Sequence, residues 1–411
     1  MNDREIELSP YREIDKALLN VEREVKLTYY LEPLNEKQRK EEFLKSKQEP
    51  KFVYKEIAYD QKEVEDKLAR EVPDKVPELA TIYNNKKQEL GLMHEMIKRR
   101  GDSDFIMQAS SEIYGTPNED VIDYAITLVR DIPPIDGPKN VPAEHVRKVM
   151  EEEVREYGLE LAIDRVDELR EILDKDGFEM LMDYLNARNR RYLDGFMEKV
   201  ERTGNDRLKE AVYKFWIIGR GRKYLTTVYP AEKNITVCGR RKFAEGDAER
   251  LAVHEIGVHA LRAANGYEQP LAIFAMGLDG YERTEEGLAV FFEEKTGHAS
   301  KEVLRDYAGR VIAVSSLLQG MNFRQTFDRL KDYKFSDEQA WKLSLRAYRG
   351  GGFVKDHIYL AGLLDMREYE KNGGDFEILY VGKIGLHHIP LVKRLIEKGI
   401  VKKPKYRAML T

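Results

Sequence analysis

Hydrophobic and polar positions alternate with a helical period through most of the first 130 residues. Between Glu13 and Leu31 the apolar side chains recur about every 3.6 residues, at Ile14, Leu18, Leu19, Val21, Val25 and Leu27. Further helices are expected at 63–70 and at 86–100, where Gly101 is a suitable C-terminal cap. The pattern predicts an N-terminal helical region over residues 1–130, followed by a proline-rich linker.

The second half of the chain combines helices with a few strands. Helical patterns cover 143–204, 248–347 and Pro390–Lys398. Short runs rich in β-branched or aromatic residues predict strands at Leu225–Tyr229, Asn234–Cys238 and Glu377–Val381. The predicted fold class is therefore α+β and mainly helical, with a small sheet. Residues 143–411 form the second region, either as a separate unit or packed with the first.

One predicted helix concentrates the residues that carry chemistry. Residues 247–266 form one helix with Asp247 as the N-cap and Asn265-Gly266 as the C-cap. It contains His254-Glu-x-x-x-His259, one residue longer than the His-Glu-x-x-His zinc motif. On an ideal α-helix, residues i and i+5 point ~140° apart, so both rings reach one ion only through a π-type bulge. Gly257 lowers the cost of such a bulge. The alternative is two unrelated histidines on a buried helix.

A pair of glutamates supplies the expected carboxylate ligand. Thr284 is a predicted N-cap, which places Glu285 and Glu286 in the first turn of an apolar helix, where the helix dipole favours the ionised form. Two histidines and one carboxylate with an open fourth position form a catalytic zinc arrangement. The alternative is that both glutamates only stabilise the helix start. His387 and His388 are adjacent and would face opposite sides of a strand, so no second metal site is expected there.

Composition narrows the classes of function. The chain has 411 residues, a formal net charge of −5 and one cysteine, Cys238, which excludes internal disulfides and Cys-rich metal sites. No uncharged stretch approaches the ~20 residues of a membrane span. The basic clusters are short and scattered among acids, so no nucleic-acid binding is expected. Because no apolar signal segment follows Met1, we expect a cytoplasmic protein.

Three motifs together resemble a known family. They are His254-Glu-Ile-Gly-Val-His259, Arg283-Thr-Glu-Glu-Gly-Leu-Ala289 and Gly350-Gly-Gly-Phe-Val-Lys-Asp-His-Ile-Tyr-Leu-Ala-Gly362. They are similar to the QEGLA-motif family of metallopeptidases, which includes the microtubule-associated tyrosine carboxypeptidase. The resemblance implies a zincin-like core that binds one Zn²⁺ per chain through His254 and His259, with Glu255 as general base. The family motif is Gln-Glu-Gly-Leu-Ala, so the shared acid, Glu286, is the expected third ligand.

The resemblance also implies a reaction, hydrolysis at the C-terminus of a peptide or protein, with aromatic C-terminal residues as the first candidates. Tyr359 and His357 are candidates to donate a hydrogen bond to the oxyanion. Arg349 and Lys355 are candidates to bind the terminal carboxylate. A Tyr or His on such an apolar helix is more often a core residue, and Arg349 and Lys355 are equally well explained as surface residues.

A rival hypothesis is a non-catalytic helical interaction protein with a structural or vestigial zinc site. Glu255 distinguishes the two hypotheses, because a purely structural zinc site needs no general base beside its ligands.

Overall fold

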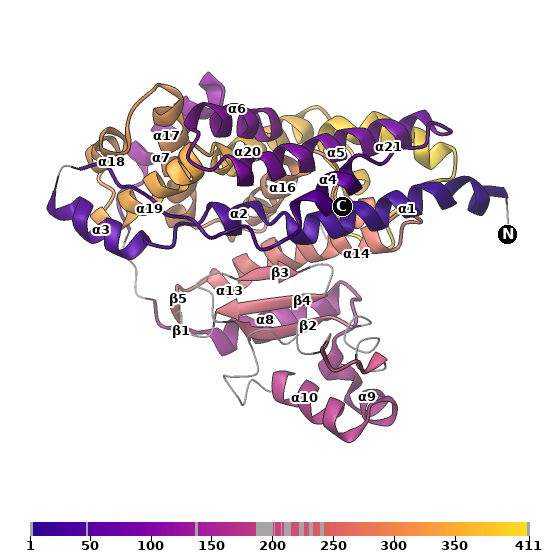
Figure 1. Ribbon diagram of the computed structural model, residues 1–411. Helices are drawn as coiled ribbons and strands as arrows, with labels where there is room; N and C mark the ends of the chain where they lie inside the picture. Colours follow the sequence, from indigo (N-terminus) through magenta and orange to yellow (C-terminus); the bar gives the residue numbers. More distant parts are fainter. Residues whose placement is uncertain are drawn as a thin grey trace.

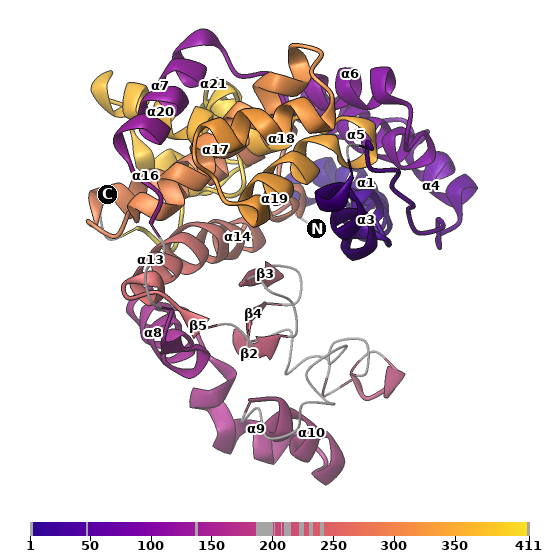
Figure 2. The ribbon, with the colours of Figure 1, turned by 90° about the vertical axis from the view of Figure 1, so that its left-hand side faces the viewer.

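The computed structural model describes residues 3–46, 48–135, 139–185, 200, 202–206, 208, 215–221, 226–229, 233–238 and 242–408. Figure 1 shows a broad body of helices above a smaller lobe. Between them runs one helical rod, made of α13 (Asp247–Leu251), a π-helix (Ala252–Ala260) and α14 (Leu261–Tyr267). Figure 2 shows the same arrangement from the side, with the lobe below the rod. Among the described residues, no helix is long and apolar enough to cross a membrane.

The N-terminal region is helical, as its pattern predicts. Its helices are α1 (Asp3–Glu24), α2 (Leu27–Leu31), α3 (Glu36–Lys45), α4 (Gln61–Leu68), α5 (Pro77–Lys98), α6 (Ser103–Tyr114) and α7 (Glu119–Asp131). The apolar stripe predicted between Glu13 and Leu31 lies on α1 and α2, where Leu18 and Val21 are fully buried. Helix α5 begins before the predicted 86–100, at Pro77, because proline fits the first turn of a helix.

The smaller lobe combines helices with two small sheets. Its helices are α8 (Ala143–Glu156), α9 (Val166–Ile172) and α10 (Lys175–Leu185), with a 3₁₀ turn at Ala162–Arg165. In the three-stranded sheet, β4 (Asn234–Cys238) lies between the parallel β2 (Ile217–Gly221) and the antiparallel β3 (Thr227–Tyr229). A second sheet pairs β1 (Val141–Pro142) with β5 (Lys242–Phe243). Both strands predicted in this part of the chain are confirmed, although Leu225 and the helical pattern at 186–199 lie outside the described residues.

The C-terminal part returns to the helical body. Its helices are α15 (Ile273–Met276), α16 (Tyr281–Lys295), α17 (Lys301–Leu318), α18 (Phe323–Asp332), α19 (Asp337–Tyr348), α20 (Ile358–Lys371) and α21 (Ile389–Glu397). Short 3₁₀ turns lie at Arg349–Gly351, Lys355–His357, Phe376–Tyr380 and Leu386–His388. The helix predicted at 390–398 is confirmed, but the strand predicted at 377–381 is wrong. The carbonyls of Leu379 and Val381 accept hydrogen bonds from the buried side chains of Arg262 and Gln269 instead of a partner strand.

Two glycines bring α16 and α20 into close contact. A Cβ on Gly287 would overlap the carbonyl carbon of Gly362, and a Cβ on Gly362 would overlap the carbonyl oxygen of Arg283. Only glycine allows this approach, since any side chain would push the helices apart. The contact holds Glu286 on α16 beside α20, the helix that carries Tyr359.

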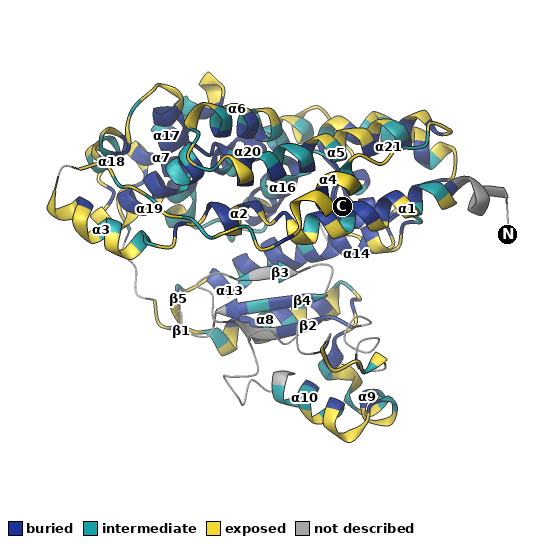
Figure 3. Ribbon diagram, in the orientation of Figure 1, coloured by how far each residue is buried: buried dark blue, intermediate teal, exposed yellow. Residues whose placement is uncertain are grey.

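The two regions predicted from the sequence share one hydrophobic core. Buried residues from Leu8 to Ala408 form one cluster that includes side chains of both 1–130 and 143–411. The smaller lobe adds a core of its own around Leu181 and Phe215. Figure 3 shows buried residues along the rod and through the helical body, including α16, α17 and α20, so the motifs lie in an enclosed part of the molecule.

A buried carboxylate ties the first helix to the rest of the body. Asp15 on α1 accepts hydrogen bonds from the backbone N–H groups of Ala272 at 2.6 Å and Ile273 at 3.0 Å, and from the Tyr83 hydroxyl at 2.7 Å. Burial raises the pKa of Asp15 to about 6, although these hydrogen bonds oppose the shift. The folded protein therefore holds a proton on Asp15 at a pH where the unfolded chain, with a pKa of ~3.9, does not.

This shift predicts a pH-dependent stability. The contribution of Asp15 is greatest below pH ~4 and is lost as the pH rises through about 6, so wild type should gain about 2–3 kcal/mol from pH 7.5 to pH 4 relative to Asp15→Asn. Urea denaturation of both proteins across this pH range measures the difference. Parallel stability curves for wild type and Asp15→Asn would contradict the burial of an ionised Asp15 at neutral pH.

Candidate metal centre

The two histidines lie on a π-helix, as the i+5 spacing requires. The rod is helical throughout, and its middle section, Ala252–Ala260, has the i→i+5 hydrogen bonding of a π-helix. Gly257 lies near its centre, where a Cβ would come within 2.9 Å of the Tyr157 hydroxyl. The Tyr380 hydroxyl donates a hydrogen bond to the Gly257 carbonyl at 2.9 Å. The predicted bulge is confirmed, and the two tyrosines pack around its wider turn.

The predicted caps of this rod are wrong at both ends. The N-cap is Gly246, which adopts a left-handed conformation with φ of 80°, and Asp247 instead accepts a hydrogen bond from the Ala244 N–H at 2.9 Å. At the other end the helix continues past Asn265-Gly266 to Tyr267. Gly266 is needed for packing, because a Cβ there would overlap the Phe274 carbonyl oxygen.

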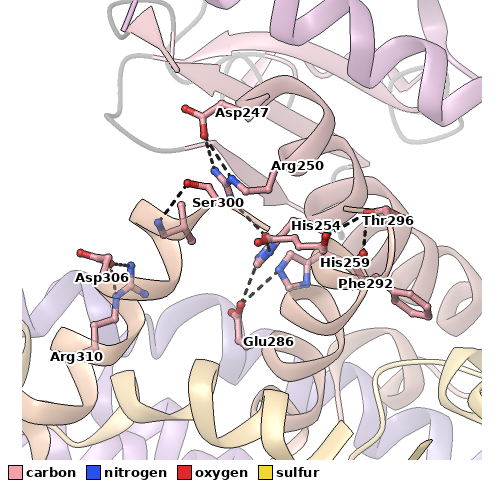
Figure 4. Close-up of polar contacts among 12 residues, drawn as sticks. Asp247, Arg250, His254, His259, Glu286, Phe292, Thr296, Ser300, Asp306 and Arg310 are labelled. Carbon is pink, nitrogen blue, oxygen red and sulfur yellow. Dashed lines mark hydrogen bonds and ion pairs between the residues drawn. The ribbon is translucent and has the colours of Figure 1, made fainter. Parts of the chain in front are cut away.

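The π-turn brings both imidazole rings to one glutamate. The ring centroids of His254 and His259 are 4.8 Å apart, and their Nε2 atoms lie 3.4 and 3.7 Å from Oε2 of Glu286. Figure 4 shows both rings pointing toward Glu286. No described residue donates a hydrogen bond to this buried Oε2. Among the described residues, these three form a group whose candidate ligand atoms all lie within 4.8 Å of one another.

The opposite nitrogen of each histidine is held by a second glutamate. Nδ1 of His254 lies 2.7 Å from Glu293, and Nδ1 of His259 lies 3.0 Å from Glu285. Because an ionised carboxylate only accepts, we assign the Nδ1 protons as donated to these glutamates. A carboxylate partner of this kind fixes the orientation of a metal-binding histidine and leaves Nε2 for the ion.

The charge around His254 favours a cation at its ring. Burial lowers the pKa of His254, but Glu286 and Glu293 outweigh burial and raise it to about 10. Without an ion, the His254 ring is therefore protonated on both nitrogens, although its Nε2 at 3.4 Å forms no hydrogen bond with Oε2 of Glu286. Because a histidine binds a metal only through a neutral ring nitrogen, an ion at this position has to displace the proton on Nε2.

The surroundings distinguish the roles of Glu285 and Glu286. Glu285 also contacts Arg262 at 2.7 Å and Lys383 at 3.0 Å, so its carboxylate is fully engaged. Burial alone would raise the pKa of Glu286, but its contact with His254 and the charge of His259 lower it to about 2. Glu286 is therefore ionised and faces Nε2 of both rings, which is the arrangement expected of a third ligand.

The predicted N-cap that would place Glu285 and Glu286 in the first turn of their helix is wrong. Thr284 is not an N-cap, since α16 begins at Tyr281 after Gly280, whose left-handed φ of 60° ends the preceding turn. The Thr284 hydroxyl instead accepts a hydrogen bond from the Leu386 N–H at 2.9 Å. Glu285 and Glu286 thus lie in the second turn, and tertiary contacts rather than the helix dipole set their ionisation.

Glu255 lies beside the centre as the motif requires. It follows His254 on the π-helix and is 9% exposed. Burial raises the pKa of its carboxyl, while the positive charges of His254 and His259 act in the opposite direction. Glu255 is therefore an acidic group within electrostatic range of both candidate ligands, in a site that is largely shielded from water.

The four candidate substrate residues lie in different surroundings. His357 is fully buried, and its Nδ1 is bonded to the Val354 carbonyl at 2.7 Å. Burial lowers the pKa of His357 to about 4, so the ring is neutral. Lys355 forms an ion pair with Glu282 at 2.5 Å. Arg349 faces Asp356 at 3.7 Å and lies 4.8 Å from the ring centroid of Phe353.

Tyr359 lies on α20, which packs closely against the helix that carries Glu286. Its ring stacks on Tyr307 at 4.8 Å between centroids, and its hydroxyl has no hydrogen-bond partner among the described residues. Burial raises the pKa of this hydroxyl, and the charge of Glu286 raises it further, so Tyr359 keeps its proton and remains a donor.

Sequence reasoning missed the residues that position the histidines. Glu293 lies two helical turns after Glu286, on the same face of α16, and contacts both His254 and Arg250. The i, i+7 spacing of these two glutamates was a usable signal, because such residues share one face of a helix. Arg262 gives no such signal, since its partners on the backbone of Leu379 and Ile384 lie more than a hundred residues away along the chain.

Asp279, His387 and His388 form a second group of closely spaced candidate ligand atoms. His388 Nε2 lies 3.0 Å from Asp279, and its Nδ1 accepts the Gly385 N–H at 3.0 Å. With Nδ1 acting as an acceptor, a neutral ring carries its proton on Nε2, so an ion bound there would have to displace that proton, as at His254. The reason for expecting no site here is wrong, because His387 and His388 lie on a 3₁₀ turn rather than on a strand and both rings lie near Asp279.

The two glutamates should behave differently when neutralised. Glu286→Gln should abolish zinc binding at neutral pH, because an amide is a poor zinc ligand. Glu285→Gln should retain zinc with an affinity about 10–100-fold lower, since only the support of His259 is weakened. Competition with a chromogenic chelator measures both affinities. A larger loss for Glu285→Gln than for Glu286→Gln would reverse the assignment.

The fold and site together define a mainly helical protein built around a buried centre of two histidines and one glutamate. The chain belongs to the microtubule-associated tyrosine carboxypeptidase family, whose sequence profile matches residues 41–172 and 224–410. The family resemblance of the sequence motifs is thereby confirmed.

Curated relatives match a shorter part of the chain. Microtubule-associated tyrosine carboxypeptidase 1 of Rattus norvegicus is 31% identical over 173 residues, which are 38% of this chain and 35% of the relative. The protein of the same name from Mus musculus is 32% identical over 157 residues, which are 34% of this chain and 32% of the relative. The chain thus spans about a third of the length of these relatives.

Proposed function

We propose that this protein is a zinc-dependent carboxypeptidase with a zincin-like core. The observation that carries the proposal is the convergence of His254 and His259 Nε2 on Glu286, with Glu255 beside them. The names of the family and of its relatives support peptidase chemistry at a C-terminus. The proposed substrate is the C-terminus of a peptide or protein. Because the relatives are named for tyrosine, aromatic C-terminal residues are the first to test.

The residues present fit a zinc ion. Two imidazole nitrogens and one ionised carboxylate, with an open fourth position, are a common catalytic zinc set. A buried carboxylate oxygen without a donor, as in Glu286, is a position that a cation satisfies. His254, His259 and Glu286 would bind the ion, which when bound activates a water and polarises the scissile carbonyl.

Glu255 and Tyr359 supply the proton chemistry. Glu255 accepts a proton from the attacking water and delivers it to the leaving amine, which is the role of a general base that later acts as an acid. The Tyr359 hydroxyl donates a hydrogen bond to the developing oxyanion. It suits this role better than His357, because the bare Nε2 of His357 only accepts hydrogen bonds in the observed arrangement.

A peptide library tests the proposal. Zinc-loaded protein is incubated with peptides that have free C-termini and varied last residues, and the products are identified by mass spectrometry. Loss of one C-terminal residue, fastest for aromatic endings, is the expected result. Cleavage within the peptides would keep the peptidase and overturn the exopeptidase specificity, whereas complete inertness would favour the non-catalytic interaction protein.

A further inference from the structure

A carboxypeptidase needs a cation for the terminal carboxylate of its substrate. Of the two cations suggested by the sequence, Lys355 is already engaged and Arg349 is largely buried. Lys355 is paired with Glu282, and Arg349 is directed toward Asp356 with an 11% exposed side chain. The terminal carboxylate carbon lies within about 4 Å of the scissile carbonyl carbon, because only one N and one Cα separate them. The cation must therefore lie beside the metal centre and retain a free donor.

Arg310 on α17 keeps a free donor and packs against Tyr359. Its Nε and Nη2 contact one oxygen of Asp306, at 2.9 and 2.7 Å, and its Nη1 has no hydrogen bond among the described residues. The guanidinium carbon lies 4.7 Å from the ring centroid of Tyr359 and 4.9 Å from that of Tyr307. The stacked rings and Asp306 thus fix the guanidinium group and leave one edge for a ligand.

Tyr359 links this arginine to the metal centre. Its ring packs against the Arg310 guanidinium, and α20, which carries Tyr359, packs on α16 at Gly287, the residue after Glu286. The charges of Glu286, Arg310 and Arg346 all act on the pKa of its hydroxyl. Figure 4 shows Arg310 and Asp306 on α17 to one side of His254 and Glu286. Arg346 is likewise held through its Nε and Nη2, which contact the two carboxylate oxygens of Asp356 at 2.6 and 2.8 Å.

We propose that Arg310 binds the terminal carboxylate of the substrate, with Arg346 adding positive charge to the same subsite. The inference rests on the proposed function, since it assigns the feature that would make the enzyme act at chain ends. Guanidinium is the preferred partner of a carboxylate because its fork presents parallel donors. A free α-carboxylate is then required for tight binding, and an amidated C-terminus lacks the charge that Arg310 recognises.

The competing explanation is that Arg310 only clamps α17 through Asp306. The two explanations predict different results for Asp306→Asn. If Arg310 is a clamp, breaking the ion pair from either side should have the same effect. If Arg310 binds substrate, Asp306→Asn leaves its charge in place and releases further donors, so recognition of the carboxylate persists.

The test measures binding in zinc-loaded Glu255→Gln protein, which should not consume the ligand. The probes are one peptide that ends in tyrosine and the same peptide with an amidated C-terminus, titrated by calorimetry. We expect the free acid to bind about 10–100-fold tighter than the amide, as for a charge-assisted hydrogen bond. Adding Arg310→Gln should remove this preference, Arg310→Lys should keep part of it, and Asp306→Asn should keep it.

The surface variant Arg394→Gln is the matched control, because it loses a half-exposed ion pair with Glu78 on α5. The inference would be overturned if the preference for the free acid survived Arg310→Gln, or if Asp306→Asn removed it as fully as Arg310→Gln does. It would also be overturned if the two peptides bound equally or did not bind. Failure of the proposed function has a different signature. Wild type would then leave the peptide library intact, whatever the binding preference shows about Arg310.

Discussion

Glu255→Gln should keep its zinc and lose its activity. Glutamine has nearly the shape of glutamate, and Glu255 is not among the three ligands that converge at the centre, so metal content should stay at one ion per chain. The amide does not accept a proton from water, and hydrolysis should fall by at least the ~10²–10⁴-fold typical of a lost acid–base group. Measuring peptide hydrolysis and zinc content on the same preparation tests both the retained metal and the lost activity.

Glu249→Gln is the matched control, because Glu249 lies on the same rod in the first turn of α13. It should leave both zinc and hydrolysis unchanged. Full activity of Glu255→Gln would exclude it as the base and leave the metal site without its proposed chemistry. If wild type is as inert as the variant over the whole library, the non-catalytic interaction protein becomes the better hypothesis.

Removal of either histidine should empty the metal centre. Two remaining ligands seldom retain Zn²⁺, so His254→Ala and His259→Ala should each reduce zinc from about one ion per chain to a trace. The loss should also remove one hydrogen bond from the buried Glu293 or Glu285, which keep their ion pairs with Arg250 and Arg262. A lost hydrogen bond to a charged group costs ~1–3 kcal/mol. Elemental analysis and urea denaturation measure the two effects.

His145→Ala is the control for this pair, since His145 lies exposed on α8. It should change neither zinc content nor stability. Full zinc occupancy in both His254→Ala and His259→Ala would remove the site that carries the proposed function, even if the stability losses were observed.

The histidine spacing allowed the most specific structural prediction. An i+5 pair on a helix either faces two directions or requires a wider turn, and that geometry follows from the sequence alone. The identity of the third carboxylate was only partly predictable. Sequence motifs favoured Glu286, but the reason is visible only in three dimensions, where Arg262 and Lys383 engage Glu285.

Two of the failed predictions share one physical cause, which is tertiary contact that overrides local preference. Thr284 has the side chain of an N-cap, yet its hydroxyl is used by the backbone of Leu386. The run Glu377–Val381 has the composition of a strand, yet two of its carbonyls accept hydrogen bonds from Arg262 on the rod and from Gln269 in the turn after it. Such partners lie far along the chain, so local propensity carries no information about them.

The π-turn also sets the rotation, about the helix axis, of the side chains on α14 that follow it. Each helical residue rotates the chain by ~100°, so one residue fewer before His259 would turn the whole of α14 by that angle. Arg262 would then point away from Leu379, and Asn265 would lose its bonds to the backbone of Tyr406 at 2.7 and 2.8 Å. The extra residue between His254 and His259 therefore does two things. It aligns the two imidazole rings, and it sets the angle at which the C-terminal segment around Tyr406 packs against α14. A change in one would change the other.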